Sequence, residues 1–235
     1  MKGLFSYDSG LFRILDKLGS LFILNMLTLL CSIPLFTIGA SFTALYYVTM
    51  KMVRDEETYI TKDYFRSFKQ NFRQGLIIWL IHLLVGAVLF FDYRLMSVNR
   101  DTLPGARGFI IVTLSCALFL AVELAYVFPV LAKFYNTVRQ TMKNAFLMGV
   151  RHFPKTVAIL IINMIFPAIT IIGLYKNGKS FLAPLYVCLG FSVTAYANSF
   201  IFVKIFDQYI TSDENEDPVT DEEYLQKLNE GSDKA

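Results

Sequence analysis

Runs of apolar residues long enough to cross a bilayer recur along the chain, separated by short polar segments. A helix needs about 20 apolar residues to span the hydrocarbon, with a range of about 17 to 25. Five runs meet this requirement: Leu18–Pro34, Gly75–Phe91, Gly108–Ala132, Thr156–Tyr175 and Ser180–Val203. The pattern predicts an all-α protein, a polytopic bundle of transmembrane helices.

One further apolar segment, Phe36–Val53, is shorter than the five and follows directly after Pro34. Proline and glycine interrupt helices, and Pro34 and Gly39 separate this segment from the run before it. We interpret the segment as a sixth, short span that forms a hairpin with the first. A five-span arrangement, in which Phe36–Val53 re-enters without crossing, is the alternative.

The distribution of Lys and Arg favours six spans, because cytoplasmic loops carry an excess of these residues. With six spans and a cytoplasmic N-terminus, 17 of the 22 Lys and Arg residues lie inside and 5 outside. With five spans the split is 14 to 8. We therefore expect a multi-pass protein of the cell membrane with both termini in the cytoplasm.

Composition agrees with a membrane location and sets the C-terminal end apart. The 235 residues are 55% hydrophobic and 17% charged, against about a quarter charged in soluble proteins. Nine of the 19 acidic residues lie between Asp213 and Asp233. The chain divides accordingly into a transmembrane helical domain, residues 1–210, and an acidic cytoplasmic tail, residues 211–235.

The stretch "ITKDYFRSFKQNFR", Ile60–Arg73, joins the short span to the next long one and has helical periodicity. At 100° per residue its aromatic side chains fall on one side and its cations on the other. This pattern predicts a cytoplasmic amphipathic helix, either a brace in the lipid interface or a docking surface for a partner. Because membrane spans flank this stretch, binding to nucleic acid is not needed to explain its cations. The candidate partner or lipid contacts are Lys62, Tyr64, Phe65, Arg66, Phe68, Lys69, Phe72 and Arg73.

A second segment of this kind, Asn136–Lys155, follows the fourth predicted span. Shifting the first segment by 82 residues places Lys51 on Lys133 and Arg73 on Lys155. Both units run from an inward span through an amphipathic helix to an outward span, so a true duplication would be a parallel repeat. Shared enrichment in positive charge is the other explanation.

Polar side chains inside the apolar runs are candidates for a functional site. An ionised group at the middle of a span costs on the order of 2.5 to 3.5 kcal/mol, so Glu123 needs a partner or a proton. The intramembrane polar set consists of Glu123, His82, Asn25, Asn163 and Asn198. These residues are expected either to form hydrogen bonds between helices or to line a binding or proton-relay site.

Catalytic and cofactor-binding motifs are absent from the sequence. The chain has two histidines and no HExxH, GxSxG, P-loop or GxGxxG pattern. The three cysteines, Cys31, Cys116 and Cys188, lie in apolar runs without the spacing of a metal site. We therefore expect a non-enzymatic protein that needs no cofactor or metal.

The N-terminal third resembles a known family. The segment Gly10–Gly75, and in it the string "IPLFTIGASFTALYY…VRDEE…FRSFKQNF", is similar to the YesL family of bacterial integral membrane proteins. Members of that family, largely uncharacterised, often accompany carbohydrate-uptake ABC transporters and genes for polysaccharide degradation. The resemblance implies an accessory role in sugar transport and supplies no catalytic or ligand-binding residues.

Two functions follow as expectations. The first is an accessory or regulatory protein that binds the permease or ATPase subunits of an ABC-type carbohydrate transporter through its cytoplasmic helices. The second is a stand-alone transporter or channel that uses the intramembrane Glu, His and Asn residues. The sequence is also compatible with assembly into a homo-oligomer.

Overall fold

The computed structural model describes residues 10–100, 104–177, 184 and 186–214, and these residues form helices without any strand. The α-helices are α1 (Gly10–Ser32), α2 (Ile38–Val53), α3 (Ile60–Val98), α4 (Ala106–Lys133), α5 (Val138–Arg151), α6 (Phe153–Asn177) and α8 (Phe191–Glu214). A 3₁₀ turn, η1 (Leu35–Thr37), precedes α2, and a π-helical turn, η2 (Tyr186–Gly190), precedes α8. The predicted all-α class is confirmed. Because α8 continues to Glu214, the predicted acidic tail begins inside a helix, and its residues 215–235 lie outside the described part.

Among the described residues, five helices are long and apolar enough to cross a membrane, and the predicted sixth span is not confirmed. Two of the five are the complete helices α3 and α4. The other three are Leu15–Ser32 in α1, Phe153–Ile172 in α6, and Val187–Ile210 in η2 and α8. α2 has 16 residues, about 24 Å at 1.5 Å per residue, against a hydrocarbon thickness of about 30 Å. Eleven of its residues are buried, because α2 packs between α1, α3, α4 and α8 at the centre of the molecule.

α2 and α3 approach so closely that their backbones touch. A Cβ atom placed on Gly39 would lie 2.1 Å from the carbonyl oxygen of Gly75, and one placed on Gly75 would lie 2.8 Å from the amide nitrogen of Ala40. No side chain fits at either position without moving a helix. The indole nitrogen of Trp79, one turn further along α3, donates a 2.8 Å hydrogen bond to the carbonyl of Leu35 and fastens the turn before α2.

α3 is one unbroken helix of 39 residues, in which the predicted amphipathic segment and the predicted span are continuous. Its length is about 58 Å, so it extends well beyond the thickness of one hydrocarbon layer. In the second unit the equivalent segment is broken at His152 into α5 and α6. Pro154 explains the break, since it lacks the N–H that would bond to Val150; the position 82 residues earlier is Phe72, which allows α3 to continue.

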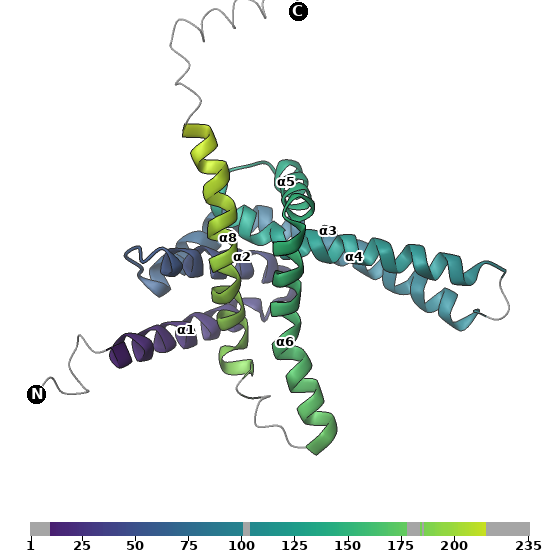
Figure 1. The fold of residues 1–235 in the computed structure, drawn as a ribbon, viewed down its shortest axis with the longest axis horizontal. Coiled ribbons are helices and arrows are strands. Elements are labelled where there is room, and N and C mark those ends of the chain that lie inside the picture. The colour runs from purple at the N-terminus through teal and green to yellow at the C-terminus, as the bar shows by residue number, and fades with distance from the viewer. Residues whose placement is uncertain (1–9, 101–103, 178–183, 185, 215–235) are drawn as a thin grey trace, which may run out of the picture.

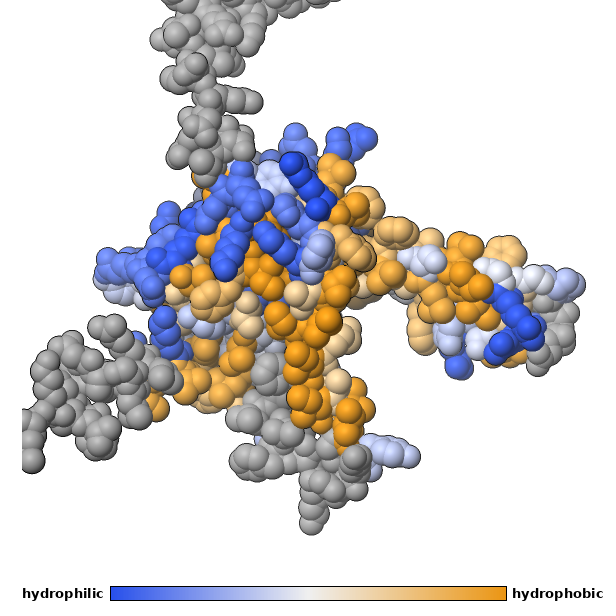
Figure 2. Space-filling view, in the orientation of Figure 1, coloured by the Kyte–Doolittle hydropathy of each residue, from blue (hydrophilic) through white to orange (hydrophobic). Residues whose placement is uncertain are grey.

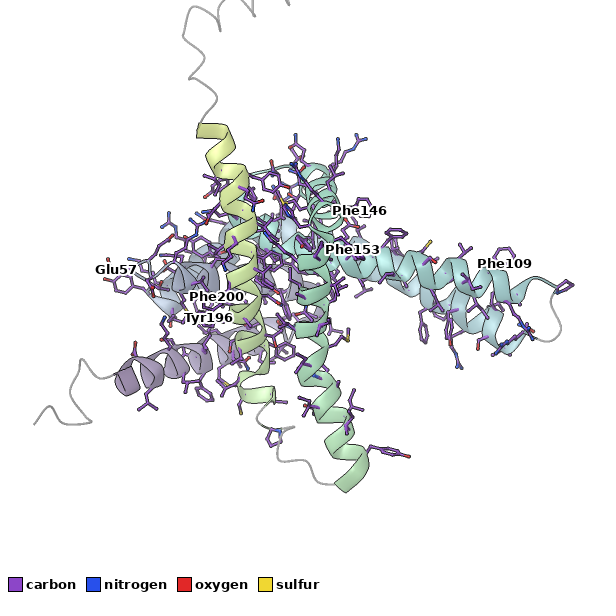
Figure 3. The ribbon with its side chains drawn as sticks, in the orientation of Figure 1. Glu57, Phe109, Phe146, Phe153, Tyr196 and Phe200 are labelled. Atoms are coloured by element: carbon purple, nitrogen blue, oxygen red, sulfur yellow. The ribbon has the colours of Figure 1, made fainter. Side chains whose placement is uncertain are left out.

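The other helices extend outward from the central region where α2 packs against α1, α3, α4 and α8, here called the hub. In Figure 1, α3 and α4 leave it side by side as a hairpin, crosswise to α6 and α8. Figure 2 shows hydrophilic side chains gathered on one end of the hub, and apolar ones along the hairpin and α6. Phe109, far out on the hairpin, and Phe153, at the start of α6, are both mostly exposed (Figure 3). Such apolar surfaces need lipid or another protein to cover them.

Candidate functional site

Four cations form one exposed stripe along the first turns of α3, here called the basic face: Lys62, Arg66, Lys69 and Arg73. Their spacing of four, three and four residues places them on one side of the helix, over about 16 Å. In the described part of the chain none of them pairs with a carboxylate. Like charges at this spacing repel by about 0.2–0.5 kcal/mol per pair, so an anionic partner would relieve an existing repulsion.

The opposite side of the same helix is packed against protein, which corrects part of the predicted contact set. Tyr64 is completely buried in the hydrophobic core, so it cannot contact lipid or a partner. Phe68 stacks on it with ring centroids 6.3 Å apart and is half-buried, as is Phe72. Phe65, exposed to 38%, is the aromatic residue of the set that remains most accessible.

Asp63 anchors this helix, and the sequence analysis did not select it. Its carboxylate accepts a 2.8 Å hydrogen bond from the Lys51 ammonium and one of 3.2 Å from the Tyr59 backbone N–H. Donating this hydrogen bond to Asp63 raises the pKa of Lys51. A carboxylate in the first turn also complements the positive end of the helix dipole. An acidic residue just inside the start of a predicted helix was the available signal.

The intramembrane pair His82 and Glu123 connects α3 to α4. His82 is almost fully buried, and its Nδ1 lies 2.8 Å from the carbonyl oxygen of Ile78. A carbonyl only accepts hydrogen bonds, so Nδ1 carries a proton and Nε2 faces the neighbouring helix. There Nε2 lies 3.9 Å from a carboxylate oxygen of Glu123. Of the four predicted partners of Glu123, His82 is the one for which the described residues show a contact, and at 3.9 Å this contact is longer than a hydrogen bond.

The three asparagines of the intramembrane polar set form hydrogen bonds at two other helix interfaces. The amide of Asn25 on α1 donates to the carbonyl of Val187 at 2.7 Å, and its oxygen accepts from the N–H of Ser192 at 3.0 Å. Asn25 therefore satisfies backbone groups at the start of α8. Asn198 on α8 donates to Asn163 on α6 at 2.7 Å. The five polar residues thus form three separate helix contacts instead of one common site.

A cavity of about 370 Å³ lies between α2, α3, α4 and α6. Asn163 is the one member of the predicted polar set that lines it. Phe42, Tyr46, Trp79 and Phe128 form aromatic walls, together with aliphatic residues from α4 and α6. Its volume is within the range of small-molecule sites, about 300–1,000 Å³.

The described residues hold no cluster of three or more His, Cys, Asp or Glu side chains suited to a metal ion. Cys31, Cys116 and Cys188 are free thiols. The structure therefore offers the basic face, the His82–Glu123 contact and the cavity as its candidate sites.

Part of the chain matches a known protein family. Residues 21–93 match the family described as "Protein of unknown function, DUF624". The match covers α2, about half of α1 and most of α3, and therefore includes the glycine contact and the basic face. The chain matches none of the curated proteins and none of the solved structures with which it was compared.

Proposed function

We propose that this protein is a non-enzymatic accessory subunit of a membrane transport system, and that it binds its partner through the basic face of α3. The observation that supports this most directly is the fixed geometry of that face. Lys62, Arg66, Lys69 and Arg73 are exposed, while the other side of the helix is held by Tyr64 in the core. A rigid stripe of cations matches a structured acidic surface, such as a cytoplasmic element of a permease or ATPase.

A lipid brace would use the helix differently. An interfacial helix buries its apolar face in the boundary between headgroups and acyl chains and turns its cations to the headgroups. On α3 the face that would enter the lipid is largely occupied by protein, with Tyr64 buried and Phe68 packed against it. Protein docking is therefore the better-supported use of the basic face.

The class of transporter comes from the resemblance to the YesL family, whose members accompany carbohydrate-uptake ABC systems. The excess of Lys and Arg in the segments around the basic face supports a cytoplasmic location for it. With the five candidate spans, the C-terminus lies on that same side of the cell membrane and the N-terminus on the opposite side. On this basis the proposed partner is the permease or ATPase of a carbohydrate transporter.

The proposal is tested by cross-linking in cells followed by purification in mild detergent and mass spectrometry. Lys62→Glu/Arg66→Glu/Lys69→Glu should reduce recovery of the transporter subunits at least about tenfold, because attraction to an acidic surface becomes repulsion. The matched control, Arg94→Glu/Arg107→Glu, reverses exposed cations at the far end of the α3–α4 hairpin and should leave recovery unchanged.

Membrane insertion of each variant is checked by protease protection of a C-terminal tag. Undiminished recovery of transporter subunits by a correctly inserted triple variant would refute the basic face as the contact. Recovery of anionic lipid in place of any transporter protein, lost in the triple variant, would assign the basic face to the membrane surface instead.

A stand-alone transporter is the second candidate, and the contact between His82 and Glu123 favours it. A buried imidazole 3.9 Å from a carboxyl group inside two apolar helices is an arrangement that can hold and release a proton. In proteoliposomes under a pH gradient, Glu123→Gln should then abolish a proton flux while the protein stays folded. Equal flux in wild type and variant would count against this function.

A further inference from the structure

The last turns of α8 lie close to the start of the basic face. Asp207 of α8 forms an ion pair with Arg54, directly after α2. One turn earlier on α2, Lys51 bonds to Asp63 in the first turn of α3. Two ion pairs on one turn of α2 therefore connect the end of α8 to the start of the basic face. In Figures 1 and 2, this end of α8 emerges where hydrophilic side chains gather on the hub.

The part of the acidic tail beyond α8, residues 215–235, carries the opposite charge to the basic face. It holds seven acidic residues against two lysines, a net charge of −5. Its densest part is the string "DEEYL", residues 221–225, in which two apolar residues follow three acids. The basic face has a matching order, since Phe65, exposed to 38%, flanks the cations. The five candidate spans place both segments on the same side of the membrane.

The length of chain between α8 and these acids is sufficient for contact. From Asp207, α8 continues for seven residues to Glu214, about 10 Å. Asp221 follows after seven more residues, which cover at most about 25 Å when extended. A segment tethered this closely has an effective concentration in the millimolar range, so a contact with a Kd of about 1 mM would occupy the face about half of the time.

We infer that the three consecutive acids of the tail, Asp221, Glu222 and Glu223, bind the basic face of α3 in the same chain and cover it when no other partner is bound. Their carboxylates relieve the repulsion between cations spaced three and four residues apart on one helix. A transporter surface must then displace the tail. That consequence rests on the proposed function, whereas the contact within the chain does not.

The contact is tested in purified full-length protein without any transporter. A water-soluble carbodiimide forms an amide between a lysine amine and a carboxylate that touch, and adds no spacer. Peptide mass spectrometry should find Lys62 or Lys69 joined to residues 221–223. The yield should fall at least about threefold between 0.1 M and 1 M salt, since the Debye length shortens from about 10 Å to about 3 Å.

Isotope labelling distinguishes this contact from one between two copies. In an equal mixture of unlabelled and ¹⁵N-labelled chains, a contact within one chain joins peptides of the same label. Cross-links found mainly between unlike labels would overturn the inference in favour of a second copy.

Variants identify the surface. Arg66→Gln/Arg73→Gln removes half of the charge of the basic face but keeps both lysines and every tail carboxylate, and should lower the yield at least about threefold. The matched control, Arg94→Gln/Arg107→Gln at the far end of the α3–α4 hairpin, should leave it unchanged. An equal yield in both variants, or cross-links to Lys143 of α5 in place of the basic face, would overturn the inference.

The competition with a transporter has its own test in cells. Asp221→Asn/Glu222→Gln/Glu223→Gln should raise the recovery of transporter subunits about twofold, because a face that is covered half of the time becomes fully available. Unchanged recovery would overturn the competition. If no transporter is recovered from any variant, the proposed function fails, and the cross-links in the purified protein still decide whether the tail binds the basic face.

Discussion

Replacing Gly39 by alanine should separate α2 from α3 and destabilise the protein strongly. The added methyl group would lie 2.1 Å from the Gly75 carbonyl oxygen and 2.9 Å from the Trp79 Cβ. The first of these atoms belongs to a helix backbone, so it cannot turn aside as a flexible side chain can. Relief requires the helices to move apart by roughly 1 Å, because carbon–oxygen contacts need about 3.3 Å.

This movement lowers the free energy of unfolding in two ways. Overpacking a core costs about 1–3 kcal/mol, and a clash with backbone belongs at the upper end of that range. The same movement stretches the 2.8 Å bond from Trp79 to Leu35, which contributes about 1 kcal/mol. We therefore expect a loss of about 3–4 kcal/mol, or a Tm lower by roughly 6–16 °C at about 2–4 °C per kcal/mol.

The assay is thermal unfolding in detergent followed by the fluorescence of Trp79, which reports on this contact directly. Gly19→Ala is the matched control, since a Cβ at Gly19 meets nothing within 4 Å, and alanine should raise helix stability by up to about 1 kcal/mol. If Gly39→Ala unfolds within about 1 °C of wild type, α2 and α3 do not pack as closely as the structure has them.

Two further predictions concern the groups that hold the helix ends. Asp63→Asn should lower the free energy of unfolding by about 2 kcal/mol in chemical denaturation, because Lys51 loses a charged hydrogen-bond partner; a loss under 0.5 kcal/mol would contradict that role. Burial, followed by the charges of Lys155 and Arg151, lowers the pKa of His152 below its usual 6.5. The unfolded chain therefore binds a proton at His152 more readily than the folded protein does. As a result, the free energy of unfolding falls as the pH drops through and below 6.5. The Tm advantage of wild type over His152→Gln should therefore be larger at pH 8 than at pH 5, and an advantage that grows on acidification would refute this sign.

The positions of the spans follow from local pattern, and the structure confirms a helix within each of the five apolar runs. The beginning of the fifth run, residues 180–183 and 185, lies outside the described residues. Their boundaries depend on single residues that can be identified in the sequence. Pro154 explains the break that divides α5 from α6, and its absence at the equivalent Phe72 allows α3 to continue, although the sequence analysis used neither residue. The structure does not confirm the short span as a crossing helix, and the sequence could not decide this because hydropathy measures only how apolar a segment is. It does not distinguish a surface covered by lipid from one covered by α1, α3, α4 and α8.

The candidate sites were predictable only in part for the same reason. The periodicity of Ile60–Arg73 places the cations and the aromatics on different sides of the helix, and the four cations are exposed. The same periodicity could not show that Tyr64 enters the core, since an aromatic face is equally suited to lipid and to protein.

The sequence by itself determined that this chain is a multi-helix membrane protein with a cationic helix and a few polar residues that must find partners. Tertiary structure alone decided which partners: His82 for Glu123, Asn163 for Asn198, and backbone groups of η2 and α8 for Asn25. Helix formation and membrane insertion depend on neighbouring residues and on hydropathy, which the sequence states directly. Pairing depends on which helices meet, and contacts such as Gly39 with Gly75 join residues that no local pattern connects.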